Sequence, residues 1–335
     1  MLTDIYRKSN HEVNNPKMAA EFVKGNFSEN YILGKSLGKG NCGFVYECTE
    51  LETKRIFAVK FVAKGNGSTS KQLRELSMEI RILKLVQHPN IVQLYDVYES
   101  IKELHLITEL LSGGSLVDYL TEKEYFTERE SAVYIHQLVS TLSYLHSNQI
   151  VHQDIKLDNI VINNRNEQLS IKIIDFGIAR LCNGSLEYLS VEGTTIYSPP
   201  EVLSYEVTDY SRDMWSVGVC TYTLLSGYFP FESETDSKLM QEIIKMNYEF
   251  TEEFEYLSKE VVDFIRNLLK RERKDRLSAK SALEHPWLRN IEYIPETKID
   301  TNRIKKLRAK MRWKSSYTAL SVAITLKRQR EYSLQ

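Results

Sequence analysis

The sequence contains little cysteine: four in 335 residues, with no CxxC pair or zinc-ligand spacing among Cys42, Cys48, Cys182 and Cys220. Scattered thiols of this kind do not make a disulfide framework, and they are typical of proteins in a reducing compartment. The cysteines therefore favour a cytoplasmic protein, with the nucleus as an alternative.

Long apolar runs are also lacking. The first 15 residues contain no apolar core of a secretory signal. The longest apolar stretch, near residues 217–225, is about half of the roughly 20 residues that span a bilayer. Internal repeats and low-complexity tracts are absent. With 42% hydrophobic and 27% charged residues, the composition is that of an ordinary globular protein with enough apolar residues for two core-forming units.

The net charge of −1 hides an asymmetry. Residues 303–330 carry ten Lys or Arg and no acid, which leaves 34 bases against 45 acids in the rest of the chain. An acidic body with a basic tail suggests an anionic partner for the tail, and the body itself can fill that role.

Strand-like runs with Gly-containing turns predominate from residue 31 to about residue 110, interrupted by a helical period over 72–86. After residue 115 helical periods dominate, at 128–148, 211–227 and 259–271. We therefore expect an α+β fold with two lobes, crossing at 110–114, and a flexible extension over 1–30. The expected domains are an N-lobe over 31–111, a C-lobe over 112–290 and a tail over 291–335.

Residues 38–45 read GKGNCGFV, a GxGxxGxV pattern. Glycine lets backbone N–H groups approach phosphate oxygens closely, although a plain hairpin gives the same pattern. Strands, rather than a helix, follow it, which disfavours a dinucleotide-binding fold. Lys60 ends an apolar strand and needs a counter-charge, which Glu79 can supply. An ammonium fixed by a carboxylate would clamp phosphate.

Residues 150–162, IVHQDIKLDNIVI, place polar side chains between two apolar ends. Phosphoryl transfer needs positioning and charge neutralisation. Asp154 could accept a hydrogen bond from an attacking hydroxyl, and Lys156 could offset charge on the γ-phosphate. Asn159 and Asp175 carry hard oxygen ligands that suit Mg²⁺.

The order of these motifs resembles the protein kinases over residues 31–290. The resemblance implies a bilobal fold, ATP and Mg²⁺ as cofactors, Asp154 as the catalytic base, and metal ligation by Asn159 and Asp175. It also implies an ion pair between Glu201 and Arg276. The nucleotide-binding residues that it implies are Leu37, Gly38, Lys39, Gly40, Gly43, Val45, Ala58, Lys60, the backbone of Glu109 and Leu111, Asp158 and Val161.

Within that family, Lys156 indicates transfer to protein serine or threonine, since tyrosine kinases usually have alanine at its position. Thr194 is similar to a substrate-loop threonine that bridges Asp154 and Lys156. Gln153 stands where most members have an arginine that binds an activation-loop phosphate. Glutamine has no charge, so we expect activity without that phosphate.

On a helix, Trp313, Tyr317, Leu320 and Ile324 fall along one face, Leu326 lies 13 residues past Trp313, and the bases cluster at both ends. This pattern is typical of a calmodulin target or a membrane-surface helix. A solvated C-terminal helix and binding to acidic lipid or nucleic acid are alternatives. We favour calmodulin, expect no nucleic-acid partner, and expect the tail to inhibit the catalytic domain.

The layout most resembles the calcium/calmodulin-dependent kinases, in particular the death-associated protein kinases, with the myosin light chain kinases as second choice. Ser316 falls at their autophosphorylated serine. Ser115 and Ile196 stand where related basophilic kinases have glutamate. Of the acidic cluster only Asp158 remains, so a preference for arginine in substrates stays open, as does the oligomeric state. A partner-binding pseudokinase is the alternative of another class, and the presence of Lys60 and Asp154 disfavours it.

Overall fold

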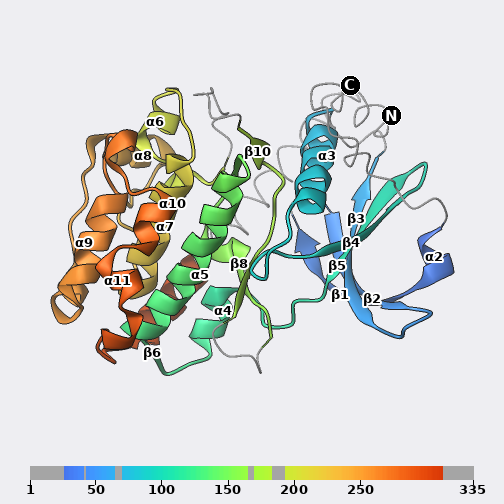
Figure 1. Ribbon diagram of the computed structural model, residues 1–335, viewed down its shortest axis with the longest axis horizontal. Helices are drawn as coiled ribbons and strands as arrows, with labels where there is room; N and C mark the ends of the chain where they lie inside the picture. Colours follow the sequence, from blue (N-terminus) through green and yellow to red (C-terminus); the bar gives the residue numbers. More distant parts are fainter. Residues whose placement is uncertain (1–25, 41–42, 65–69, 165–169, 183–192, 312–335) are drawn as a thin grey trace, which may run out of the picture.

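The computed structural model describes residues 26–40, 43–64, 70–164, 170–182 and 193–311. It has two lobes, a small one built on a β-sheet and a larger helical one (Figure 1). The expected α+β bilobal fold is confirmed. Within the described ranges, no helix is long and apolar enough to cross a bilayer.

The N-lobe is an antiparallel sheet with the strand order β1-β2-β3-β5-β4. Val45 of β2 lies opposite Lys60 of β3 and opposite Gly38 of β1, so the lysine lies in the same row of the sheet as Gly38. The buried face of β3 consists of apolar side chains, which explains its central place. The strand bounds are β1 (Tyr31–Gly40), β2 (Gly43–Glu50), β3 (Ile56–Ala63), β4 (Leu94–Glu99) and β5 (Glu103–Glu109).

Helix α3 (Ser70–Leu85) is the one long helix of the described N-lobe. Leu76, Ile80 and Leu83 follow its helical period, and all three are buried in the main core.

The residues before β1 differ from our expectation, which was a flexible extension over residues 1–30. Residues 27–30 form α2 (Phe27–Asn30), and Phe27 is buried in a second, aromatic cluster on the sheet.

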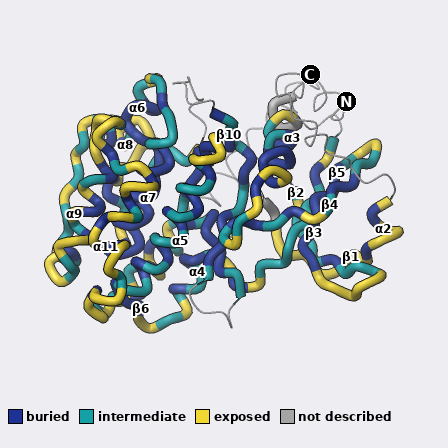
Figure 2. The backbone as a smooth tube through the Cα atoms, in the orientation of Figure 1, coloured by how far each residue is buried: buried dark blue, intermediate teal, exposed yellow. Residues whose placement is uncertain are grey.

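The C-lobe is organised around α7 (Ser211–Ser226), which is buried along almost its whole length (Figure 2). Helix α5 (Glu128–Ser147) packs against it and begins with a capping box formed by Thr127 and Glu130. The other C-lobe helices are α4 (Leu116–Thr121), α6 (Pro200–Leu203), α8 (Asp236–Lys245), α9 (Lys259–Leu268), α10 (Ala279–Leu283) and α11 (Pro286–Arg289).

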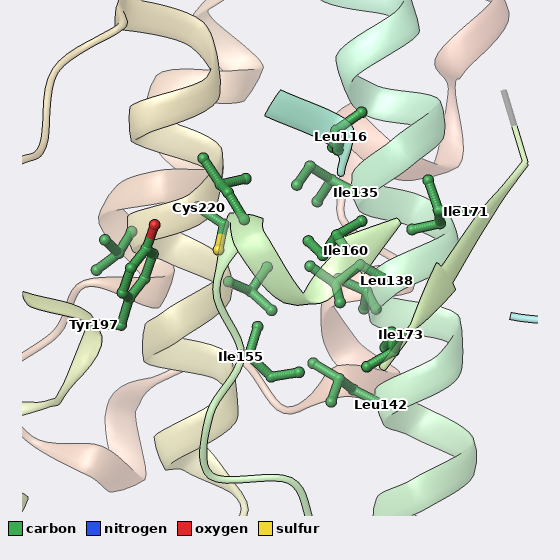
Figure 3. Close-up of a cluster of buried hydrophobic side chains, with 14 of the residues drawn as sticks. Leu116, Ile135, Leu138, Leu142, Ile155, Ile160, Ile171, Ile173, Tyr197 and Cys220 are labelled. Carbon is green, nitrogen blue, oxygen red and sulfur yellow. The ribbon is translucent and has the colours of Figure 1, made fainter. Parts of the chain in front are cut away.

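A core of apolar side chains supports the loop that follows α5 (Figure 3). Ile155 and Ile160 on this loop are each 1% exposed, and they pack with Leu138 of α5 and Cys220 of α7. Apolar residues of the loop thus hold its backbone in the core, which fixes the positions of the polar residues between them.

The start of the tail is part of the C-lobe. Strand β11 (Lys298–Asp300) pairs with β6 (Tyr125–Thr127), and residues 301–311 are helical. Ile304 and Leu307 of this helix are buried, with exposures of 1% and 4%. The helix begins at residue 301, two residues before the basic segment over 303–330. The tail residues Trp313, Ser316, Tyr317, Leu320 and Leu326 lie outside the described residues.

Candidate active site

The backbone of the polar loop is held by Asp213 of α7. Its carboxylate accepts hydrogen bonds from the backbone N–H groups of His152 at 2.9 Å and Gln153 at 2.8 Å, and contacts His146 Nε2 at 2.9 Å. Burial raises the pKa of Asp213, but the hydrogen bonds and the charges of the two histidines outweigh burial and lower it overall. An ionised Asp213 thus holds the loop backbone at His152 and Gln153 against α7.

Asp154 is the centre of the polar cluster. Lys156 Nζ donates to Asp154 Oδ2 and, at 3.2 Å, to Thr194 Oγ1. Thr194 Oγ1 in turn donates to Asp154 Oδ1 at 3.2 Å. The structure therefore places Thr194 between Asp154 and Lys156, as the sequence predicted, and it joins the loop to the segment on which a substrate hydroxyl would lie.

The environment of Asp154 favours its ionised form. Burial raises its pKa, whereas the ammonium of Lys156 and a hydrogen bond from Asn159 lower it, and the net pKa lies below the usual value. A carboxylate that is ionised at neutral pH can accept a hydrogen bond from a hydroxyl. Its hydrogen bond from Lys156 holds the carboxylate in place, and a fixed carboxylate keeps that hydroxyl oriented.

Asn159 and Asp175 lie on neighbouring segments, because β8 (Ile160–Ile162) pairs with β9 (Ile171–Ile173). Asn159 Nδ2 donates to the carbonyl oxygen of Asp154 at 2.9 Å, which directs its Oδ1 as an acceptor. Asp175 has a φ of 64° and lines the cavity between the lobes. An amide oxygen and a carboxylate fit Mg²⁺, which typically takes one or two protein oxygens and completes its shell with phosphate and water.

Lys60 and Glu79 meet across the N-lobe. Lys60 Nζ donates to both carboxylate oxygens of Glu79 at 3.0 Å, and Glu79 is only 5% exposed. β3 therefore supplies the lysine and α3 supplies its fixed partner. This geometry holds an ammonium at the inner wall of the cavity, where it could bind a phosphate oxygen.

A cavity of about 380 Å³ lies between the lobes. Its volume falls in the range of small-molecule sites. Sequence reasoning did not assign Val92, Leu106 or Ile174 to the nucleotide site; each belongs to an ordinary apolar run that carries no separate signal. The lining includes eight of the expected nucleotide-binding residues, namely Leu37, Gly38, Val45, Ala58, Lys60, Glu109, Leu111 and Val161.

The end of β1 and the start of β2 line this cavity through Leu37, Gly38 and Val45. Gly38 has a φ of 150°, which favours glycine. At Gly43 a Cβ atom would lie 1.8 Å from the carbonyl oxygen of Phe61, so close strand packing alone requires glycine there. Gly40 ends β1, and the side chain of Lys39 lies outside the described residues.

Asp158 does not line the cavity, contrary to our expectation that it helps to bind nucleotide. It lies on the short helical turn at Leu157–Asn159 and binds the tail instead: Arg308 Nη1 donates to Asp158 Oδ1 at 2.6 Å. The same guanidinium donates from Nε and Nη2 to both oxygens of Asp118, at 2.8 and 2.9 Å. Its side chain is 17% exposed.

Asp118 is a charged residue of this site that the sequence analysis did not identify. Ser115 caps α4 and donates its hydroxyl to Asp118 Oδ2 at 2.8 Å, which orients the carboxylate toward Arg308. The serine that replaces the expected glutamate therefore positions another acid one turn later. Burial lowers the pKa of Arg308, but Asp118 and Asp158 outweigh burial and raise it.

The expected ion pair between Glu201 and Arg276 is present. Two guanidinium nitrogens donate to the two carboxylate oxygens at 2.7 and 2.6 Å, and the exposures are 5% and 6%. The guanidinium also lies 5.0 Å from the ring centroid of Trp215. This buried pair connects α6, which follows Thr194 in the chain, to the segment that precedes α10.

Comparisons with known proteins agree with this geometry. A family model described as the protein kinase domain matches residues 31–288. Death-associated protein kinase 2 of Mus musculus is 37% identical over 308 residues, 89% of this chain and 83% of that protein. Myosin light chain kinase A of Dictyostelium discoideum is 37% identical over 277 residues, 82% and 93% of the two chains. The solved autoinhibited serine kinase domain of the giant muscle protein titin has a TM-score of 0.77 at 35% identity, covering 85% of this chain and 88% of that one.

Proposed function

This chain belongs to the protein kinase family and is a serine/threonine kinase, and on that premise we propose that its tail inhibits it and that calcium-loaded calmodulin releases it. The observation that carries the proposal is the docking of Arg308 on Asp118 and Asp158. Asp158 belongs to the same loop as Asp154, so the tail lies beside the residues that would perform catalysis.

In the proposed reaction, Asp154 accepts the hydrogen bond of the substrate hydroxyl and orients it toward the γ-phosphate of ATP. Lys156 balances charge as the phosphoryl group moves, and Thr194 keeps the two side chains in register. Lys60, held by Glu79, binds the nucleotide phosphates. Mg²⁺ on Asn159 and Asp175 would supply further charge neutralisation.

The tail has the charge and the position of an inhibitory segment. Three charge-assisted hydrogen bonds from Arg308 join it to the C-lobe, and Lys310 adds an ion pair of 2.8 Å with Glu232. Charge-assisted bonds are the strong ones among protein hydrogen bonds. A tail seated here occupies two acids that a basic peptide substrate would otherwise meet.

Release by calmodulin requires that calmodulin bind the undocked tail better than the docked one. The basic segment with apolar anchors at Trp313 and Leu326 has the composition of a calmodulin-binding helix. A phosphate on Ser316 would add negative charge to that segment and weaken its hold on acidic calmodulin.

The two acids also suggest a substrate preference. Once Arg308 leaves, one arginine of a peptide could donate to Asp118 and Asp158 in its place, with the same bidentate geometry at Asp118. We therefore propose that serine peptides with an arginine near the target residue are the better substrates.

The test is phosphate transfer from radiolabelled ATP to an arginine-containing serine peptide. The full chain is compared with a chain that ends at Asn302, which keeps β11 and the hydrogen bonds from Thr301 to the carbonyl oxygens of Lys123 and Glu124. We expect the shortened chain to be fast without calcium, and the full chain to become fast only with calcium and calmodulin. Equal rates for both chains in all conditions would contradict control by the tail.

The same assay separates two alternatives. A partner-binding pseudokinase would transfer no phosphate in either form. A constitutively active kinase with a lipid-binding tail would be fast without calmodulin. Its full chain would cosediment with vesicles that contain an acidic phospholipid, and the chain that ends at Asn302 would not. Lys60, Asp154 and Asp175 are all in place, which favours catalysis over the first alternative.

A further inference from the structure

Gln153 has two hydrogen-bonding partners that come from different parts of the C-lobe. Its Nε2 donates to the carbonyl oxygen of Ile178 at 2.9 Å, and its Oε1 accepts from Arg212 Nη1 at 2.9 Å. Gln153 is 5% exposed and Arg212 is 1% exposed. Gln153 also has a φ of 70°, a conformation that non-glycine residues adopt only when their surroundings hold them there.

Arg212 lies near Gly193, at the far end of the segment that begins at Ile178. A Cβ atom at Gly193 would lie 3.2 Å from Arg212 Nη2 and 3.3 Å from the carbonyl oxygen of Gln153, and Gly193 has a φ of 120°. Ile178 follows the Asp175-Phe176-Gly177 sequence, and Gly193 precedes Thr194. The two side chains therefore lie at both ends of the segment between Gly177 and Thr194: Gln153 donates to Ile178, and Arg212 Nη2 lies beside Gly193.

The chemistry of these contacts specifies glutamine at position 153. The residue must donate to a carbonyl oxygen at one atom and accept from a guanidinium at another, and the glutamine amide does both without adding charge. Glutamate would place an oxygen against the Ile178 carbonyl. Arginine would place two guanidinium groups together in a buried site, where neither charge is balanced and burial is unfavourable.

We infer that Gln153 and Arg212 form a clasp, hereafter the 153–212 clasp, that positions the catalytic loop and both ends of the activation segment without a phosphate. Both are positioning residues. Gln153 adjoins Asp154, and Arg212 adjoins Asp213, whose carboxylate holds the loop backbone. Most family members carry a positive charge at the position of Gln153, and here Arg212 of α7 supplies that charge. The inference rests on the kinase activity and is independent of the proposed control by the tail.

The test uses the full chain, with all variants assayed under the same conditions both with and without calcium–calmodulin. The single variants are Gln153→Arg and Arg212→Gln, and the exchange variant carries both. In the exchange variant an arginine at 153 can donate to Ile178 O and to a glutamine at 212, which restores the pair with its direction reversed. Arg266→Met, at an exposed arginine of α9, is the control for loss of an arginine.

We expect each single variant to lower kcat by about tenfold or more, since each removes a buried hydrogen bond to a charged group. Rates are expressed per nucleotide site, counted by titration with a fluorescent ATP analogue, so that unfolded protein does not contribute. The KM for ATP should stay within about twofold, because the cavity lining is unchanged, and the exchange variant should recover to within about threefold of the original kcat.

Several results would overturn the clasp. Single variants with unchanged kcat would do so, as would an exchange variant that melts like the original protein yet is no faster than the single variants. If Arg212→Gln binds no ATP analogue, Arg212→Lys gives the same comparison with the charge retained. Treatment of the unchanged protein with a phosphatase should alter its rate by less than about twofold. A tenfold loss would show that a phosphate performs the positioning.

Discussion

Arg308 offers the sharpest quantitative test, because one side chain carries three of the hydrogen bonds that seat the tail. Replacing it by alanine removes its contacts with Asp118 and Asp158 and leaves every residue of the catalytic loop unchanged. Hydrogen bonds to charged groups contribute about 1.5–3 kcal/mol each when buried, and exposed ion pairs about 0–1 kcal/mol.

The exposures of the three side chains, 17%, 28% and 36%, place this cluster between those limits. A net contribution of about 2 kcal/mol changes the docking equilibrium by roughly thirtyfold. If the tail is docked about 99% of the time, Arg308→Ala raises the open fraction from about 1% to about a quarter. The rate without calcium should rise in the same proportion.

The assay is the initial rate of phosphate transfer to a serine peptide without calcium. Lys310→Ala is the matched control in the same helix, since its ion pair with Glu232 has a lysine that is 65% exposed, and we expect about a twofold effect at most. The reasoning is refuted if Arg308→Ala stays within about twofold of the original rate while the chain ending at Asn302 is far faster.

Other side chains give independent predictions. Lys60→Met should lower kcat by about a hundredfold or more, with Lys35→Met at an exposed pair as the control, measured at saturating ATP. Arg276→Met should cost about 3–5 kcal/mol in urea unfolding, because Glu201 remains buried, and a loss under about 1 kcal/mol would contradict the role of the pair. The pKa of Asp154 is lower in the folded state, so its ionised form stabilises the fold at neutral pH, and this contribution is lost as pH falls through the folded pKa. The difference in unfolding free energy between the original protein and Asp154→Asn should therefore shrink from about pH 7 to about pH 3; an unchanged difference would argue against the shift.

The fold could be predicted because apolar periodicity reports burial directly. The helical period over 259–271 became α9 (Lys259–Leu268), and that over 211–227 became α7, with boundaries differing by a few residues. Motif spacing likewise placed Lys60 opposite Glu79, because the chemistry of phosphate binding restricts which residues can stand there.

Contacts between half-buried charges far apart in the sequence could not be predicted. Arg308 and Asp118 are separated by 190 positions, and neither belongs to a periodic pattern or a motif. The sequence indicated only that a glutamate was missing at Ser115. That the serine orients an acid one turn later depends on how α4 begins, which is a property of three-dimensional geometry.

Arg212 shows the same limit inside the core. A sequence window around α7 shows an arginine beside an aspartate, which usually indicates a solvated position. Only the packed structure reveals that this arginine is 1% exposed and that it faces Gln153, and therefore why an amide stands in the loop.

The pairing of β11 with β6 determines how far the end of the chain can swing. With Thr301 also fastened to the carbonyl oxygens of Lys123 and Glu124, the pivot lies at residue 301. Arg308 follows about seven residues later, so even a fully extended segment carries it no more than about 25 Å from that pivot. In the proposed control, opening is then a movement of the tail about a fixed point, and the tail can dock again without a search through solution as soon as calmodulin departs.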